Sequence, residues 1–300
     1  MERRPFGKTG MNVSVLGFGG AEIGFGNASV ETARELLNRA LDSGLNIIDT
    51  AECYNTSEEL IGQAVAGRRN DFYLFTKVGH ASGLPYIDWT PELIEASIDR
   101  SLKRLQTDYV DMIHLHTCSE EDLRKGDVIA ALQKARDAGK TRFIGYSGDD
   151  QAARYAVDCG VFDSLQTSIN IAEQQPITLT LPKAIEQGMG VVAKRPVANV
   201  AWINGDNPPD QDYPKPYWER LQKLKYPFLT EQSLEESVGT ALRFTLSLPG
   251  VCTAIVGTMK PGRWEQNAKY AAQGPLPQDQ VEAIRRRWQE VVEPGWTGLG

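Results

Sequence analysis

The amino-acid sequence predicts an α/β fold, a closed (β/α)8 TIM barrel with an N-terminal β-hairpin and an extra C-terminal helix. Eight strand-like stretches alternate regularly with helical patterns along the 300 residues. The strands are too apolar to face water on either side, which is typical of parallel strands that are covered by helices. No linker rich in Gly, Ser or Pro divides the chain. We therefore expect residues 1–300 to form a single barrel domain.

The strands are predicted first. A hairpin is indicated by residues 3–7, a Lys8-Thr9-Gly10 turn and residues 11–20. The eight strand-like stretches that build the predicted barrel are residues 13–19, 45–51, 71–77, 109–116, 141–147, 164–170, 190–196 and 253–258.

Helical patterns lie between these strands, for example at residues 30–44, 57–67, 91–106 and 127–140. The third carries an apolar stripe along one face, made by Ile94, Ile98, Leu102 and Leu105. Pro91 fits the first helical turn behind a Thr90 cap. Glycines stand where helices should end, namely Gly44, Gly67, Gly139 and Gly188. Residues 199–229 are interpreted as a long loop, and residues 281–292 as the extra helix.

Composition excludes several classes of protein. The net charge is −7, and no basic run exceeds the arginines at 285–287, so no nucleic-acid surface is expected. No apolar run approaches the ~20 residues of a membrane span. The first ten residues lack the apolar stretch of a secretory signal, so a cytoplasmic location is expected.

The cysteines have no metal-ligand spacing, so we expect reduced thiols and no metal; they are Cys53, Cys118, Cys159 and Cys252. Nothing in the sequence predicts the oligomeric state.

The main alternative fold is a doubly wound nucleotide-binding sheet. Its glycine fingerprint fails here, because Gly17 and Gly19 are followed by Glu22 where the third glycine belongs.

Polar residues gather at the predicted carboxyl ends of strands, where barrels carry their chemistry. Asp49 and Tyr54 follow the second strand, Lys77 ends the third and His116 ends the fourth. An ammonium about 4 Å from a phenol with pKa ~10 could lower that pKa by up to ~3 units. Asp49 would keep Lys77 charged, and His116 would bind a substrate oxygen. The four residues therefore suit the protonation of an oxygen that gains negative charge, although each alone also has a structural interpretation. We interpret His114 as a core residue.

These residues resemble the motifs of the aldo-keto reductases over nearly the whole chain. The sequence NIIDTAECY is similar to the family's Asp-Thr-Ala-x-x-Tyr motif, FTKVG to its lysine strand and YVDMIHLH to its histidine strand. The resemblance implies that Tyr54 is the catalytic proton donor, with Asp49, Lys77 and His116 as the other catalytic residues. It further implies NADPH-dependent reduction of a small carbonyl substrate, an aldehyde or a ketone, to an alcohol.

The same resemblance implies where NADP(H) binds without a Rossmann fingerprint. The nicotinamide carboxamide would contact Ser147, Gln166 and Asn170. The segment IVGTMKPGRWEQN resembles the family's adenosine 2′-phosphate site, which assigns to the cofactor Gly257, Thr258, Lys260, Arg263, Gln266 and Asn267. Pro261 and Gly262 open a helix whose N-terminal amides favour an anion. The planar guanidinium of Arg263 can donate two hydrogen bonds to the extra phosphate, so NADPH is expected rather than NADH.

Three features depart from the family pattern. Gly148 follows Ser147 where many members have Asn. Lys194 stands where many members stack an aromatic ring on the nicotinamide, and we expect Lys194 or Arg195 to contact the diphosphate instead. Residues 199–229 align with no familiar loop.

Two other functions stay open. One is an NADPH-binding sensory or regulatory module with little turnover, like the potassium channel β subunits. The other is a barrel lyase that uses a neutral Lys77 as a Schiff-base amine, which Asp49 would oppose. Aromatic residues on strand-end loops would either wall the substrate pocket or pack the loops; they are Tyr86, Trp89, Trp202, Tyr213, Tyr217 and Trp218.

Overall fold

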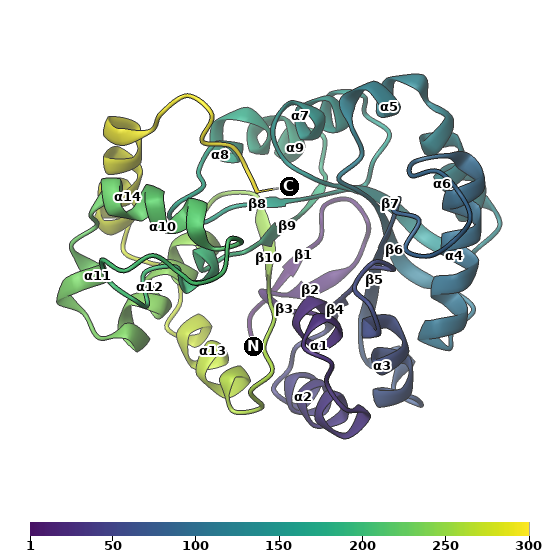
Figure 1. Cartoon of the computed structure of the whole chain (residues 1–300), viewed down its shortest axis with the longest axis horizontal. Helices are drawn as coiled ribbons and strands as arrows, with labels where there is room; N and C mark the ends of the chain where they lie inside the picture. Colours follow the sequence, from purple (N-terminus) through teal and green to yellow (C-terminus); the bar gives the residue numbers. More distant parts are fainter. Residues whose placement is uncertain (300) are drawn as a thin grey trace.

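Eight parallel strands close into a barrel surrounded by helices, as the sequence predicts (Figure 1). The structure is a computed structural model that describes residues 1–299. Each strand pairs with its neighbours along the chain, and the last strand pairs with the first to close the barrel. The barrel strands are β3 (Leu16–Gly19), β4 (Ile47–Asp49), β5 (Tyr73–Val78), β6 (Val110–His116), β7 (Thr141–Ser147), β8 (Ser164–Ser168), β9 (Gly190–Lys194) and β10 (Val251–Val256).

The strand register brings the carboxyl ends of the central strands together. His116 pairs with Ser147, and Ser147 pairs in turn with Gln166. Lys77 pairs with His114, two residues before the end of β6. Because successive side chains of a strand point to opposite faces, His114 and His116 point to the same side at different depths. The register therefore gathers the predicted site residues at one end of the barrel.

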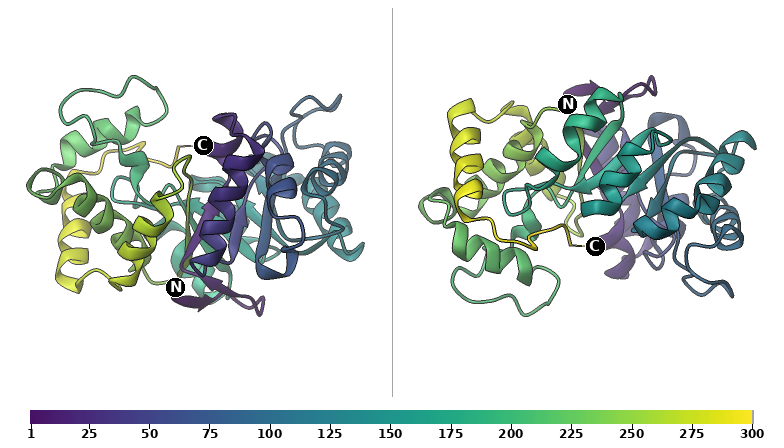
Figure 2. Two further views of the ribbon diagram at one scale, coloured as in Figure 1. Left: turned by 90° about the horizontal axis from the view of Figure 1, so that it is seen from below. Right: turned by 90° about the horizontal axis from the view of Figure 1, so that it is seen from above.

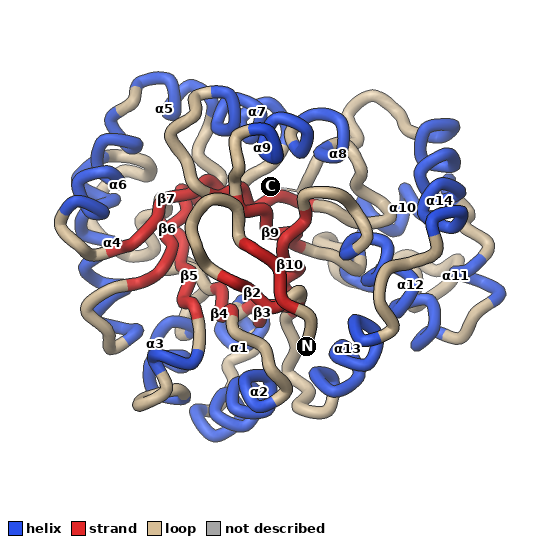
Figure 3. Tube along the Cα trace, turned by 180° about the vertical axis from the view of Figure 1, so that it is seen from behind, coloured by secondary structure: helices blue, strands red, loops and turns tan. Residues whose placement is uncertain are grey.

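Helices cover the outside of the barrel (Figure 3). The main covering helices are α2 (Val30–Asp42), α3 (Ser57–Ala64), α4 (Pro91–Leu105), α6 (Asp127–Asp137), α7 (Asp150–Asp158), α9 (Leu181–Glu186), α12 (Leu234–Leu246) and α13 (Arg263–Ala272). Shorter elements in the connections are α1 (Ala21–Phe25), α5 (Glu120–Lys125), α8 (Pro176–Leu179) and the 3-10 turns η1 (Arg69–Asp71) and η2 (Ala198–Val200). Among the described residues, none of the helices combines the length and apolar character that a membrane span requires.

Local sequence signals set the ends of several helices. The Thr90 hydroxyl accepts a hydrogen bond from the Leu93 amide, and Pro91 is the first residue of α4, as predicted. The four glycines predicted to end helices all have positive φ, which a residue without Cβ adopts at little cost; the values are 93° for Gly44, 84° for Gly67, 76° for Gly139 and 68° for Gly188.

An antiparallel hairpin of β1 (Arg3–Pro5) and β2 (Asn12–Ser14) precedes the barrel. Phe6, in its turn, is fully buried and packs in a small cluster with Phe75 and Met112. The hairpin that carries Phe6 lies across one end of the barrel (Figure 3). Residues 13–19 do not form one continuous strand as predicted, because the chain leaves the hairpin at Val15, whose carbonyl accepts a hydrogen bond from Ala254.

Residues 199–229 are not the long loop that the sequence suggests. They contain α10 (Lys215–Leu224), which buries Tyr217 and Leu221, and the start of the short α11 (Phe228–Glu231). The stretch between η2 and α10 does project as a loop (Figure 2). The predicted extra helix is α14 (Gln278–Val291). After it, Trp296 packs against Trp288 with a ring-centroid distance of 5.3 Å, and the chain runs back toward the barrel (Figure 1).

Candidate active site

A buried ion pair lies at the carboxyl end of β4 and β5. Lys77 Nζ donates a hydrogen bond to Asp49 Oδ2 at 2.6 Å and another to the Thr50 carbonyl at 2.7 Å. Gln166 Nε2 donates to the second carboxylate oxygen of Asp49 at 3.1 Å. Burial opposes the charge of Lys77, but the neighbouring acidic groups together, with Asp49 first among them, raise the pKa of Lys77. The pair therefore holds a fixed ammonium inside the barrel.

Tyr54 lies next to this ammonium. Lys77 Nζ is 4.9 Å from the centroid of the Tyr54 ring. Burial raises the pKa of the Tyr54 phenol, and the charge of Lys77 acts in the opposite direction without reversing the shift. Lys77 thus acts on this pKa in the expected direction, but burial, which the sequence does not reveal, has the larger effect. The phenol stays protonated, and Lys77 offsets part of the cost of its ionisation.

His116 completes the group of four predicted catalytic residues. Its ring meets the Tyr54 ring edge-on, with centroids 5.8 Å apart. Burial, with the nearby charge of Lys77, lowers the pKa of His116 well below its usual value, so the imidazole is neutral. Cys53 Sγ lies 3.3 Å from His116 Nδ1.

The contact with Cys53 favours one tautomer of His116. Burial raises the pKa of the Cys53 thiol to about 12, so the thiol is protonated and can donate a hydrogen bond to His116 Nδ1. The proton of the neutral imidazole then resides on Nε2, which is the hydrogen-bond donor left for a ligand.

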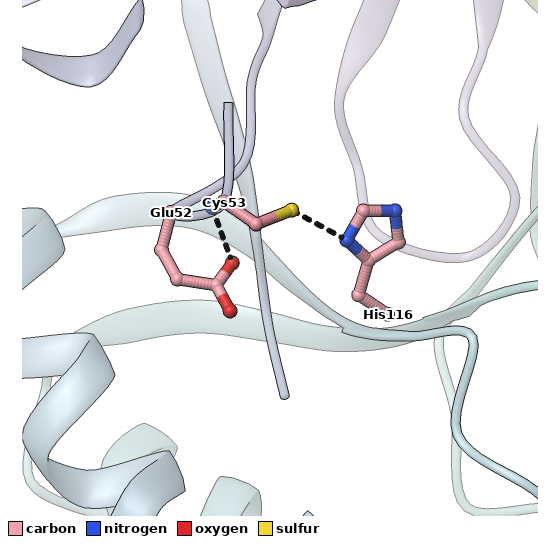
Figure 4. Close-up of side chains that lie close together, drawn as sticks. All are labelled: Glu52, Cys53 and His116. Atoms are coloured by element: carbon pink, nitrogen blue, oxygen red, sulfur yellow. Dashed lines mark hydrogen bonds between the residues drawn. The ribbon is translucent and has the colours of Figure 1, made fainter. Parts of the chain in front are cut away.

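Glu52 lies beside Cys53 and was not predicted as a site residue (Figure 4). Its carboxylate accepts hydrogen bonds from the Gly79 amide at 3.1 Å, the His80 amide at 2.9 Å and the Cys53 amide at 3.1 Å. Burial raises the pKa of Glu52 to about 7. Glu52, Cys53 and His116 each offer an atom of a kind that binds metal ions, and these atoms lie within 4.8 Å of one another.

The other two histidines lie close to this group. His114 is fully buried and its Nε2 lies 3.1 Å from the Ser164 hydroxyl, which agrees with the predicted core position. His80 is half-buried, with its ring centroid 5.2 Å from that of His116 and 5.0 Å from that of Trp89. Trp89 Nε1 donates to the His116 carbonyl at 3.0 Å, and this hydrogen bond holds the loop between β5 and α4 against the site.

Two of the three residues expected to bind a carboxamide have unused buried polar atoms. Within residues 1–299, the Ser147 hydroxyl and Gln166 Oε1 lack a hydrogen-bond partner although both are buried. Such groups are costly unless a ligand or water satisfies them. The amide of Asn170 is already used, since its Nδ2 donates to the Arg195 carbonyl at 3.0 Å and its Oδ1 accepts from the Ala172 amide at 2.8 Å.

Comparison with known proteins identifies the family. A sequence model described as "Aldo/keto reductase family" matches residues 15–289. The chain belongs to this family. It is 29% identical to L-galactose dehydrogenase from Arabidopsis thaliana, over 89% of this chain and 87% of that protein. It is 27% identical to a probable voltage-gated potassium channel subunit beta from the same plant, over 92% and 93%. The structure of an aldo-keto reductase from Bacillus halodurans in its holo form superposes with a TM-score of 0.84 at 27% identity, over 99% of each chain.

Membership of the aldo/keto reductases makes the chain an oxidoreductase of a family that uses nicotinamide cofactors. The Ser147 hydroxyl and Gln166 Oε1, which lack hydrogen-bond partners, could bind the carboxamide of such a cofactor. A carboxamide presents both a donor and an acceptor, so it could satisfy the Gln166 oxygen and the Ser147 hydroxyl together.

Lys194, which departs from the aldo/keto reductase pattern, pairs with Asp149, a residue that was not predicted to belong to the site. Asp149 follows β7, and its Oδ2 lies 3.0 Å from Lys194 Nζ and 3.8 Å from Arg195 Nη1. Burial opposes the ionisation of Asp149, but Lys194 and hydrogen bonds from Ser168 and Thr167 lower its pKa overall. Arg195 also donates to the Tyr213 hydroxyl at 2.5 Å. The sequence did contain a signal for Asp149, because this polar residue lies two positions beyond a predicted strand end.

The predicted 2′-phosphate segment forms the turn into α13. The Lys260 amide donates to the Thr258 hydroxyl at 3.0 Å, and Arg263 is the first residue of the helix. Arg263 Nη1 donates to Gln266 Oε1 at 3.1 Å. Asn267 is buried, and its Nδ2 has no partner within the described chain. Gly257 approaches β3 so closely that a Cβ there would lie 3.0 Å from the Gly19 carbonyl oxygen.

The aromatic residues predicted to wall a pocket or to pack loops differ in burial. Trp202 and Tyr217 are buried, and the Trp202 indole donates to the Ser237 hydroxyl at 3.0 Å, so both pack the loops. Tyr86 and Tyr213 are exposed. Phe25, which the sequence analysis did not single out, is also exposed and packs on Tyr54 with ring centroids 5.5 Å apart.

Proposed function

We propose that the chain catalyses the NADPH-dependent reduction of an aldehyde or ketone to an alcohol, with Tyr54 as the proton donor. The arrangement of Lys77 carries this proposal. Its ammonium is buried, is held by Asp49 at 2.6 Å, and lies 4.9 Å from the Tyr54 ring centroid. A cation in this position stabilises the phenolate that forms when Tyr54 gives up its proton.

The chain's own residues have distinct tasks in this reaction. Tyr54 holds the proton that the carbonyl oxygen receives, and its raised pKa keeps that proton in place before reaction. His116 is neutral and presents Nε2–H to the same oxygen. Asp49 keeps Lys77 charged and fixed in direction. Bound NADPH supplies the hydride.

The cofactor proposal has two independent supports in the structure. At the proposed nicotinamide end of the site, the Ser147 hydroxyl and Gln166 Oε1 have no hydrogen-bond partner within the described chain. At the other end Lys260 and Arg263 lie at the N-terminus of α13, a position that favours an anion such as a 2′-phosphate. We assign the remaining contacts to Lys194, Arg195, Gly257, Thr258, Gln266 and Asn267.

The decisive experiment measures NADPH oxidation with a panel of aldehydes, ketones and aldoses. Aldoses are included because of the similarity to L-galactose dehydrogenase. Tyr54→Phe should lower kcat by roughly 10²–10⁴-fold, the usual contribution of a positioned proton donor, while NADPH affinity is retained. Tyr73→Phe is the matched control, because Tyr73 is half-buried at the opposite end of β5. Wild-type turnover by Tyr54→Phe would show that another group supplies the proton.

A regulatory module that binds NADPH with little turnover is the second candidate, favoured by the similarity to a potassium channel β subunit. Tight NADPH binding without turnover on any carbonyl of the panel would support it. The Schiff-base lyase is disfavoured, because Asp49 raises the pKa of Lys77 and so keeps the amine protonated.

A further inference from the structure

Two segments that are far apart in the sequence bring Glu52 and Cys53 to His116. The loop after β4 crosses the end of β5, since the Glu52 amide donates to the Lys77 carbonyl at 3.2 Å. Hydrogen bonds from the Gly79 and His80 amides to the Glu52 carboxylate hold the loop there. The crossing places Cys53 Sγ 3.3 Å from His116 Nδ1 (Figure 4).

These three side chains offer the donor atoms that Zn²⁺ and Cd²⁺ prefer. A sulfur, an imidazole nitrogen and a carboxylate oxygen lie within 4.8 Å of one another. Zinc binds sulfur at ~2.3 Å and nitrogen at ~2.0–2.1 Å, so two tetrahedral ligands of these kinds stand roughly 3.5 Å apart. The observed separation of 3.3 Å between Cys53 Sγ and His116 Nδ1 is close to this value. We propose that Glu52, Cys53 and His116 form an inhibitory binding site for a thiophilic divalent cation.

The ligands are held in place before any ion arrives. Backbone amides orient the Glu52 carboxylate through three hydrogen bonds, as outer partners orient metal ligands in general. Cys53 and His116 are half-buried rather than sealed in the core. Sequence spacing gives no signal for this site, because His116 lies 63 residues beyond Cys53.

The charges balance when the ion binds. The cation displaces the thiol proton of Cys53 and any proton that Glu52 carries, both of which pass to the solvent buffer, and a metal–sulfur bond forms without any change of oxidation state. Cys53 thiolate and Glu52 carboxylate together carry two negative charges, which neutralise a divalent cation. The nearest ammonium, Lys77, is already paired with Asp49.

Occupation of this site interferes with the proposed reaction, on which the inhibitory effect depends. An ion bound to His116 Nδ1 lies beside the Tyr54 ring, which is 5.8 Å from the His116 ring. It replaces the contact between Cys53 and Nδ1 and adds positive charge to the imidazole that would present Nε2–H to a carbonyl oxygen. Inhibition should therefore be reversible by a chelator and should leave NADPH binding intact.

Titration of the purified full-length protein with Cd²⁺ tests the site without any use of activity. We expect one equivalent of Cd²⁺ to produce the ultraviolet charge-transfer absorption of a Cd²⁺–thiolate bond. Cys53→Ser should abolish this absorption, and Glu52→Gln should weaken the affinity at least ~10-fold. Cys159→Ser is the matched control, because Cys159 is a half-buried thiol at the end of α7 and should not affect the absorption.

The outcomes separate the site from the proposed function. An unchanged Cd²⁺ absorption in Cys53→Ser, or a signal lost in Cys159→Ser instead, would overturn the site. Should Cys53→Ser fold poorly by circular dichroism, an unchanged affinity in Glu52→Gln would do the same. Reversible inhibition of turnover by Zn²⁺, with resistance in Cys53→Ser, would support the inhibitory role. Cd²⁺ binding in a protein that never oxidises NADPH would leave the site standing and refute the proposed function.

Discussion

Lys77 Nζ lies 2.6 Å from Asp49 Oδ2, and both side chains are almost completely buried. Removal of one partner from such a pair leaves an uncompensated charge inside the protein, which costs about 3–5 kcal/mol. The pair thus links the stability of the barrel to the proposed chemistry of Tyr54.

Asp49→Asn should lower the free energy of unfolding by about 3–5 kcal/mol and also lower kcat, because Lys77 loses its carboxylate. Urea unfolding and NADPH oxidation measure the two effects. The double variant Asp49→Asn with Lys77→Met removes the unpaired charge, so it should regain part of the stability but none of the activity. Recovery of activity in the double variant would contradict the role assigned to Lys77.

Ser147→Ala tests the carboxamide site. The Ser147 hydroxyl has no partner within the described chain, so its removal should not destabilise the fold. It should weaken the binding of NADP⁺ by roughly 2- to 10-fold, the value of one hydrogen bond, as measured by calorimetry. Ser97→Ala is the matched control, since Ser97 is also buried without a partner but lies on α4. Equal affinities in both variants would remove Ser147 from the cofactor site.

Much of this arrangement could be predicted because it depends on local sequence. Alternating apolar stretches and glycine stops indicated the barrel, and the strand ends then brought Asp49, Lys77 and His116 to one mouth. Residues 199–229 were predicted less well. Their prolines suggested a loop, but Pro216 lies in the first turn of α10, where proline is tolerated.

The electrostatics of the site could not be predicted in the same way. The pKa of Tyr54 depends on how deeply the phenol is buried, and burial outweighs the charge of Lys77. The partner of Lys194 is Asp149, from a different strand end, and the contact depends on how β7 and β9 are placed around β8. Sequence spacing alone reports neither burial nor contacts between distant loops.

Arg263→Ala tests the preference for NADPH. Arg263 begins α13, and loss of its charged hydrogen bonds to a 2′-phosphate should cost about 1.5–3 kcal/mol, a weakening of NADPH binding by roughly 10- to 100-fold. NADH binding should hardly change, because NADH lacks that phosphate. Lys269→Ala is the control, since Lys269 is exposed farther along the same helix. Parallel losses for NADPH and NADH would place Arg263 outside the phosphate site.

A second buried ion pair should make the stability depend on pH. Glu173 pairs with Arg220, which also donates at 2.7 Å to the Thr297 carbonyl and so ties down the end of the chain. Burial raises the pKa of Glu173 from 4.5 to about 7, although Arg220 acts in the lowering direction. Between these pH values the folded chain retains a proton that the unfolded chain has released. The free energy of unfolding should therefore fall as the pH rises through this range.

Glu173→Gln removes the titrating group and isolates its effect. Urea unfolding of both proteins at pH values below and above this range should show that the wild type loses more stability than the variant as the pH rises. Other groups titrate in both proteins and cancel in the comparison. Glu186→Gln is the control, because Glu186 is exposed at the end of α9 and should follow the wild type. The free energies of unfolding of the wild type and Glu173→Gln could instead differ by the same amount at every pH. That result would show that Glu173 is ionised throughout the range, as expected if its contact with Arg220 alone set its charge.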